Sequence, residues 1–200
     1  MTRLLLATRN GEKLAELRRI LATQDLSGVR VLGLADLPPF AEAPETGATF
    51  EENALAKARD AARETGLPAV ADDSGLAVDA LGGMPGVLSA RWAGRHGDDD
   101  ANLRLVLDQL TDVPDERRGG AFVCAAALVV PGGDEIVVRG EWRGRMARQA
   151  KGDNGFGYDP IFVPDGSDVT SAELSPQRKD AESHRGLALR AILPHLLRSL

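Results

Sequence analysis

Four short stretches of this 200-residue chain combine residue types that could do chemistry. The first is Thr8–Lys13, which follows an apolar run and precedes a helical pattern. A turn that leads from a strand into a helix presents backbone N–H groups and the positive end of the helix dipole, and both suit phosphate oxygens. Thr8 and Asn10 can donate hydrogen bonds, and Lys13 adds a positive charge. The glycine spacing of a Walker A loop is missing, so an ordinary capped turn remains an alternative.

The second stretch contains two adjacent carboxylates, Asp72 and Asp73. Adjacent carboxylates repel each other, so their burial is costly unless a cation or a hydrogen-bond donor compensates. Successive side chains of a strand point to opposite faces, so one of the two is expected to face a site. Mg²⁺ typically binds one or two carboxylates together with substrate phosphates, and Glu45 in the preceding loop is a candidate second ligand. A solvated acidic turn is the alternative.

The third stretch, Gly155–Asp159, places Phe156 between two glycines. Such a backbone can approach a ligand closely, while the phenyl ring offers a flat face on which a base could stack. Asp159 precedes a proline, which holds it extended. The alternative is a glycine-rich hairpin whose aromatic rings, including that of Tyr158, lie in the core.

The fourth stretch, Ser175–Gly186, concentrates positive charge in a chain that is acidic as a whole. Its cationic residues are Arg178, Lys179, His184 and Arg185. These donors suit phosphate and keto oxygens, although each could also be an ordinary surface charge, and His184 could be a helix cap. Cys124 lies in an apolar run and is predicted to be a core residue.

The apolar pattern predicts the elements that must position these stretches. Helices are expected from Lys13 to near Thr23, for about fifteen residues after Thr49, from Asp98–Asp100 onward, and from around Glu182 to the end of the pattern. Strands are expected at Arg3–Ala7, Val29–Leu32, Ala69–Ala71, Ala121–Val130, Glu135–Met146 and Ile161–Val163. Asp72 and Asp73 then lie at the end of a strand. Alternating strands and helices with one hairpin predict an α/β fold, a mixed sheet covered by helices.

Composition limits the possible partners. The net charge is −6, which argues against a nucleic-acid polymer as a partner but leaves small anionic ligands open. The longest apolar run, Ala121–Val130, is about half of a membrane span, and the first apolar stretch is too short for a secretory signal. One cysteine excludes an intramolecular disulfide. We therefore expect a cytoplasmic protein with no membrane partner.

The order of these motifs along the chain resembles that of the Ham1/RdgB family, the inosine/xanthosine triphosphate pyrophosphatases. The resemblance runs from about Leu4 to Leu189. Each motif alone is weak evidence for the family, whereas the ordered set of motifs is highly specific for it. The segments that carry it are Thr8–Lys13, Glu45–Ala54, Ala71–Leu76, Leu81–Val87, Ser89–Arg91, Gly155–Pro160 and Ser183–Gly186.

The resemblance implies a fold and an activity. The fold would be a long central mixed sheet flanked by helices, with residues 1–200 forming a single two-lobed domain that has a cleft between its lobes. The activity would be hydrolysis of dITP, ITP and XTP to the nucleoside monophosphate and pyrophosphate, which removes non-canonical purines from the nucleotide pool. The family needs Mg²⁺ and is usually a homodimer.

The resemblance also implies roles for individual residues. Asp73 would be the catalytic carboxylate and would share the metal with Glu45, although Pro44 stands where some relatives have a second acid. Asp72 could share either role. The substrate contacts would be Thr8, Arg9, Asn10, Gly11, Glu12 and Lys13 at the triphosphate, Ser74 beside Asp73, Phe156, Gly157, Tyr158 and Asp159 at the base, and Lys179, His184 and Arg185 as the remaining nucleotide contacts.

Two other functions remain open at this stage. One is a Maf-like pyrophosphatase for other nucleotides, against which the Phe156 loop and the Ser183–Arg185 segment argue. The other is a nucleotide-binding sensor without turnover. The acidic pair favours turnover, because a protein that only binds a triphosphate gains little from carboxylates near its anions. A structural interaction domain would bind no nucleotide at all.

Overall fold

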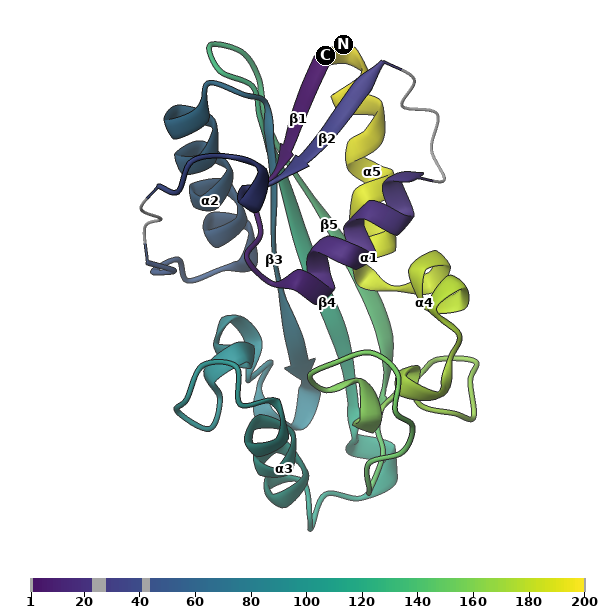
Figure 1. Ribbon diagram of the computed structural model, residues 1–200. Helices are drawn as coiled ribbons and strands as arrows, with labels where there is room; N and C mark the ends of the chain where they lie inside the picture. Colours follow the sequence, from purple (N-terminus) through teal and green to yellow (C-terminus); the bar gives the residue numbers. More distant parts are fainter. Residues whose placement is uncertain (1, 23–27, 41–43, 200) are drawn as a thin grey trace. The chain divides into compact units, whose positions relative to one another are not determined.

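The chain folds into a mixed sheet with helices on its faces (Figure 1). A computed structural model describes residues 2–22, 28–40 and 44–199. The strands are β1 (Thr2–Leu6), β2 (Val29–Gly33), β3 (Ala69–Val78), β4 (Gly119–Val129), β5 (Glu135–Met146) and β6 (Phe162–Pro164). The helices are α1 (Gly11–Ala22), α2 (Phe50–Thr65), α3 (Asp99–Gln109), α4 (Pro176–Glu182) and α5 (His184–Ser199).

The strand order is β2-β1-β3-β4-β5-β6. Strands β2 and β3 each pair with β1 in parallel, whereas β5 and β6 pair antiparallel. The predicted α/β fold with a mixed sheet is therefore confirmed. Among the described residues, no helix is both long enough and apolar enough to cross a membrane.

The chain divides into two compact units. Unit 1 comprises residues 1–73, 124–140 and 184–200, and unit 2 comprises residues 74–123 and 141–183. The chain passes from one unit to the other within β3, in the middle of β4, within β5, and once more between α4 and α5.

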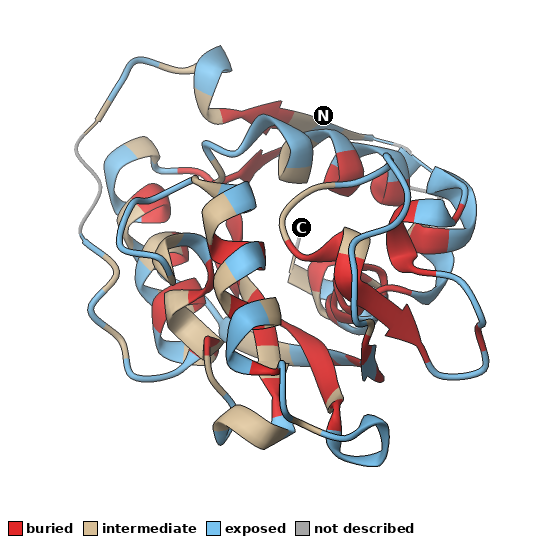
Figure 2. Ribbon diagram, turned by 90° about the horizontal axis from the view of Figure 1, so that it is seen from below, coloured by how far each residue is buried: buried red, intermediate tan, exposed pale blue. Residues whose placement is uncertain are grey.

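Unit 1 packs helices on both faces of its strands. On one face, α1 and α5 bury apolar side chains against β1, β3 and β4. Helix α2 lies on the other face, where Phe50, Ala54, Ala58 and Ala62 recur at helical spacing and are buried. Figure 2 shows the buried residues along the strands and on single stripes of the helices, as an amphipathic pattern requires.

Local sequence explains where α2 begins and ends. The Thr49 hydroxyl accepts a hydrogen bond from the Glu52 backbone N–H at 3.1 Å, and Gly66 closes the helix in the left-handed conformation. These two features bound the helix that the sequence predicts for about fifteen residues after Thr49. Asn53 accepts a bond from the Gly47 N–H at 2.8 Å, which ties the loop that carries Glu45 to this helix.

Unit 2 has its own core. Side chains of α3 pack with the second half of β3, with β4 and β5, and with the segment around Phe162. The rings of Phe122 and Trp142 pack against the Phe162 ring, with centroid distances of 4.7 and 5.4 Å. The core also contains Tyr158, which comes from the glycine-rich stretch predicted to bind a ligand.

The expectation of an extended Asp159 is wrong, because this residue begins a short 3-10 helix (Asp159–Ile161) whose next residue is the proline. Two larger elements also differ from the sequence-based expectation. Strand β3 does not end before Asp72 but continues through Asp72–Gly75 to Val78. Propensity disfavours aspartate and glycine in strands, but each carboxylate here finds compensating partners, and a Cβ on Gly75 would lie 2.3 Å from the Ser89 hydroxyl oxygen. Helix α4 was not predicted; Ser175 caps it and a proline begins it. The predicted helix end at Thr23 lies outside the described residues.

Candidate functional site

The Thr8–Lys13 turn begins where β1 stops and β3 continues. Leu6 pairs with Val70, and the Ala7 N–H donates to the Val70 carbonyl at 2.8 Å. After Ala7 the segment that follows β1 leaves the sheet. Residues that follow the carboxyl end of a parallel strand commonly bind ligands in α/β proteins. The turn is therefore placed beside the stretch of β3 that carries Asp72 and Asp73.

Asn10 caps helix α1. Its Oδ1 accepts from the N–H groups of Glu12 and Lys13 at 2.9 and 3.0 Å, and the Asn10 N–H donates to the Thr8 hydroxyl oxygen at 3.3 Å. Two of the N–H groups expected to bind a phosphate are thus already bonded within the turn. The side chain of Arg9 donates to the Phe40 carbonyl at 3.1 Å. What the turn offers an anion is chiefly the charge of Lys13.

One face of β3 carries a buried chain of alternating charges that we call the Asp72 network: Lys13, Asp72, Arg185 and Glu16. Lys13 Nζ lies 3.0 Å from Asp72 Oδ2, Arg185 Nε lies 3.6 Å from the same oxygen, and Arg185 Nη1 donates to Glu16 Oε2 at 2.8 Å. Burial alone would raise the pKa of Asp72, but the charges of Lys13 and Arg185 lower it to about 2. Asp72 is therefore a fixed anion that holds Lys13 in place.

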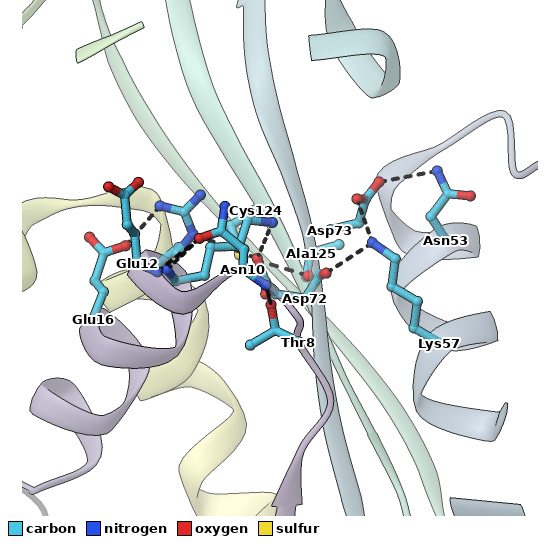
Figure 3. Close-up of polar contacts among 12 residues, drawn as sticks. Thr8, Asn10, Glu12, Glu16, Asn53, Lys57, Asp72, Asp73, Cys124 and Ala125 are labelled. Carbon is cyan, nitrogen blue, oxygen red and sulfur yellow. Dashed lines mark hydrogen bonds and ion pairs between the residues drawn. The ribbon is translucent and has the colours of Figure 1, made fainter. Parts of the chain in front are cut away.

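The opposite face of β3 carries a second group, the Lys57 cluster, which consists of Glu45, Asn53, Lys57 and Asp73. Figure 3 shows Asn53 and Lys57 reaching Asp73 from α2. Lys57 Nζ forms ion pairs with Glu45 and with Asp73 Oδ1, the latter at 3.0 Å, and donates to the Asp72 carbonyl at 3.4 Å. Asn53 Nδ2 donates to Asp73 Oδ2 at 3.1 Å. Both oxygens of Asp73 are thus oriented by side chains of α2.

The Lys57 cluster keeps an excess of negative charge. Burial raises the pKa of Asp73, and the Glu45 charge adds to this effect while Lys57 opposes it. Burial would lower the pKa of Lys57, but the charges of Asp73 and Glu45 raise it overall. Two carboxylates thus share one ammonium, and a pair of carboxylates at one place attracts cations.

The two aspartates of the acidic pair therefore have different environments. Their side chains point to opposite faces of β3, as the alternation of a strand predicts (Figure 3). Sequence reasoning did not single out Glu16, Asn53 or Lys57. A signal existed for the last two, because Asn53 and Lys57 lie four residues apart and border the apolar stripe of α2.

In unit 2, Asp159 organises the loop around Phe156. Its Oδ2 accepts from the Phe156 N–H at 2.9 Å and from Lys179 Nζ at 2.5 Å, and its Oδ1 accepts from the Ser171 hydroxyl at 2.7 Å. Lys179 Nζ also lies 5.2 Å from the centroid of the Phe156 ring. Asp159 is only 2% exposed, so its carboxylate fixes the loop and Lys179.

The two aromatic rings of this loop differ in their exposure to solvent. The Tyr158 ring is buried, and its hydroxyl donates to the Ser89 carbonyl at 2.7 Å. Phe156 remains partly exposed. Only Phe156 therefore presents a ring that a ligand could meet, and Tyr158 anchors the loop to the core of unit 2.

The predicted cationic patch of residues 175–186 is divided between the two units. Lys179 belongs to unit 2 and pairs with Asp159, whereas Arg185 belongs to unit 1 and pairs with Glu16. His184 is buried at the start of α5. The surface-charge alternative does not fit Lys179, His184 or Arg185, because all three are buried.

Each candidate residue belongs to one of the two units. Unit 1 holds Thr8, Arg9, Asn10, Gly11, Glu12, Lys13, Glu45, Asp72, Asp73, His184 and Arg185, and unit 2 holds Ser74, Phe156, Gly157, Tyr158, Asp159 and Lys179. Cys124 is buried in the core of unit 1, as predicted, and burial raises the pKa of its thiol.

A magnesium ion would fit the Lys57 cluster by the chemistry of its donors. Within the described ranges, no group of three or more His, Cys, Asp or Glu side chains could hold a metal. Mg²⁺ needs fewer protein ligands when substrate phosphates complete its shell. Glu45 and Asp73 converge on one cation, the Lys57 ammonium, so their oxygens are placed to bind a shared cation.

Known proteins resemble this chain over nearly its whole length. A relative from Nocardia farcinica, named dITP/XTP pyrophosphatase, is 70% identical over 196 residues, which make up 98% of this chain and 95% of that protein. A relative from Mycobacterium tuberculosis with the same name is 66% identical over 200 residues, which make up 100% of this chain and 97% of that protein.

Solved structures agree with these relatives. A nucleoside-triphosphatase / dITP/XTP pyrophosphatase from Mycobacterium abscessus is 63% identical with a TM-score of 0.79, and the match covers 96% of this chain and all of that one. A HAM1 protein from Coxiella burnetii is 41% identical with a TM-score of 0.86, and the match covers 99% of this chain and all of that one.

The fold and the site define an α/β protein with buried acidic and cationic groups along one central strand. The Ham1 family model matches residues 4–195. The chain belongs to the Ham1 family.

Proposed function

We propose that this chain hydrolyses dITP, ITP and XTP to the nucleoside monophosphate and pyrophosphate. The observation that carries the proposal is the convergence of Glu45 and Asp73 on a single cation, beside the turn that presents Lys13. The names of the relatives at 66–70% identity support the substrate class. The acidic residues favour turnover over binding alone, because a protein that only binds a triphosphate gains little from carboxylates near its anions.

Magnesium is part of this proposal. Asp73 and Glu45 would hold the ion, and the bound ion would neutralise phosphate charge and polarise the phosphorus that is attacked. The residues fit this role because both are carboxylates, the ligands that Mg²⁺ prefers, and because one of them lies on β3 while the other lies in a loop tied to α2.

Asp73 would also orient the attacking water. Asn53 and Lys57 fix the direction of its carboxylate, and burial raises its pKa, which makes it a better proton acceptor than an exposed aspartate. Lys13, held by Asp72, would stabilise the negative charge that develops on the departing pyrophosphate. The remaining residues of the Thr8–Lys13 turn would position the phosphate chain.

Residues of unit 2 would recognise the base. The ring of Phe156 offers a stacking face, and Lys179, fixed by Asp159, supplies a cationic donor next to it. Hypoxanthine and xanthine present a keto oxygen at the position where adenine presents an amino donor. A fixed donor would therefore accept the keto bases and be left unpaired against adenine, which disfavours ATP. Ser74, His184 and Arg185 remain proposed nucleotide contacts.

A panel of nucleoside triphosphates tests the proposal. We expect monophosphate and pyrophosphate from dITP, ITP and XTP with Mg²⁺, little product from ATP, and none after chelation with EDTA, measured by ion-exchange chromatography of the products. Asp73→Asn is the inactive control, with a loss of about 10² or more in turnover. This variant should fold, because burial already disfavours the charged form of Asp73. Diphosphate and phosphate as products would contradict the proposal.

The same panel separates the alternative functions. A preference for pyrimidine or modified triphosphates would favour the Maf-like pyrophosphatase, and binding of ITP without any product would favour the sensor. The homodimer and the cytoplasmic compartment stay predictions, and light scattering after size-exclusion chromatography checks the first.

A further inference from the structure

The Lys57 cluster contains a cation of the chain itself at the place proposed for magnesium. The Lys57 ammonium forms ion pairs with both Glu45 and Asp73. The side chains of Lys57 and Glu45 are 22% and 28% exposed, whereas that of Asp73 is 9% exposed. The ammonium therefore lies at the more exposed edge of the cluster, between solvent and the more buried carboxylate of Asp73.

A counter-cation is needed there when no metal is bound. Without Lys57, Glu45 and Asp73 would lose the cation that they share, and the Asn53 amide would still donate a hydrogen bond to Asp73. An uncompensated charge in a buried position strongly destabilises a protein. Lys57 thus keeps the two acids in place in the metal-free protein.

The same contacts put Lys57 in competition with a divalent ion. Asp73 Oδ1 binds Lys57 Nζ at 3.0 Å, and its other oxygen accepts from Asn53. A divalent ion bound to Glu45 and Asp73 would repel an ammonium that stayed between the same carboxylates. The flexible stem of a lysine allows the ammonium to leave without movement of the helix.

We propose that Lys57 is the resident counter-cation of the Glu45–Asp73 pair and that a divalent metal must displace it. This inference rests on the proposed function, which places the metal on these two residues. Its consequence is that the nucleotide-free protein binds metal weakly. A triphosphate, by offering anionic oxygens to the displaced ammonium, raises the affinity for metal, so that metal and substrate enter together.

Metal binding without nucleotide tests the inference. The probe is Mn²⁺, and the free ion is measured by its electron paramagnetic resonance signal with wild type, Lys57→Met and Arg59→Met. Arg59 is the matched control, because it lies on the same helix but pairs with Glu135 and is exposed. We expect Lys57→Met to bind Mn²⁺ about tenfold or more tightly than wild type, and Arg59→Met to stay close to wild type.

Thermal unfolding gives a second measurement that does not depend on activity. Lys57→Met and the more conservative Lys57→Gln should both unfold at lower temperature than wild type without metal. Added Mg²⁺ should raise their midpoints more than that of wild type, since the ion replaces the missing ammonium. If neither variant folds even with Mg²⁺, the inference is wrong, because an ion in place of Lys57 would restore the pair.

Two further results would overturn the inference. One is an Mn²⁺ affinity of Lys57→Met that is equal to or weaker than that of Arg59→Met. The other is tight binding that survives Asp73→Asn in the Lys57→Met background, since the ion would then be elsewhere. Neither result depends on turnover. If metal displaces the Lys57 ammonium but the protein releases no pyrophosphate from ITP, the proposed function is wrong. The displacement of Lys57 by metal would still hold.

Discussion

Asp72 and Asp73 are chemically identical neighbours whose pKa values shift in opposite directions. Asp72 faces Lys13 and Arg185, and their charges outweigh the effect of burial. Asp73 shares Lys57 with Glu45, and burial there dominates. The first carboxylate is therefore suited to fix a cation, and the second is suited to accept a proton or a metal.

The low pKa of Asp72 predicts a loss of stability in acid. Its pKa is about 2 in the folded protein and close to 3.8 when exposed, so its ionised form stabilises the fold above about pH 4. This contribution, about 2 kcal/mol at 1.36 kcal/mol per pKa unit, is lost as the pH falls from about 4 to about 2.

Urea unfolding of wild type and Asp72→Asn between pH 5 and pH 2 measures this contribution. The difference in free energy of unfolding between the two proteins should shrink by about 2 kcal/mol over that range. The other acids titrate in both proteins and cancel. A difference that stays constant with pH would contradict the predicted role of Asp72.

At the scale of elements, three segments hold the proposed site. Strand β3 carries the aspartates, α2 orients one of them through Asn53 and Lys57, and the loop at Gly155–Asp159 is built around the Asp159 carboxylate. Each segment is fixed by side chains from another segment. The geometry of the site therefore depends on tertiary contacts more than on the local preference of any one element.

The glycine loop predicts a contrast between two substitutions. Gly155 has a φ of +77°, and a Cβ there would lie 2.1 Å from Asp159 Oδ2. Gly157 has a φ of +63°, but a Cβ there meets nothing within 4 Å. Gly157→Ala should cost about 1 kcal/mol for its backbone alone, and Gly155→Ala about 2 kcal/mol more because of the added collision.

Chemical denaturation of both variants checks this contrast. The loss of stability should be clearly larger for Gly155→Ala, and the Michaelis constant for ITP should rise with it, since the Phe156 N–H and Lys179 are bonded to the same carboxylate. Equal losses in the two variants would show that the Asp159 carboxylate does not constrain the loop.

At the scale of the whole molecule, the proposed substrate contacts are divided between two compact units. The triphosphate and metal residues belong to unit 1, and the base residues belong to unit 2, with Ser74 following Asp73 directly on β3. Each unit has its own apolar core. Substrate binding should therefore slow the hydrogen exchange of backbone amides in both units.

Hydrogen exchange measured with a non-hydrolysable ITP analogue and Mg²⁺ tests this assignment of contacts to the two units. We expect slower exchange in Thr8–Lys13 and in Gly155–Asp159, and no change in the exposed turn Pro131–Asp134 of unit 1. Protection confined to one unit would contradict the contacts proposed for the other unit.

Local patterns in the chain were enough to predict most of the helices and strands, the family resemblance and most of the candidate residues. The Thr49 cap, the closing glycine Gly66 and the strand alternation that separates Asp72 from Asp73 are local features, and local features follow from backbone chemistry. The ordered motifs likewise led to the Ham1 family.

The partner of each charged group, in contrast, follows from how the chain packs in three dimensions. Lys57 and Asp73, which are 16 residues apart, lie on a helix and a strand that only their packing brings together, and Arg185 lies 169 residues from Glu16. The continuation of β3 through two aspartates and a glycine also depends on these distant partners. Such pairings depend on how the helices pack on the sheet, and neither propensity nor spacing encodes that packing.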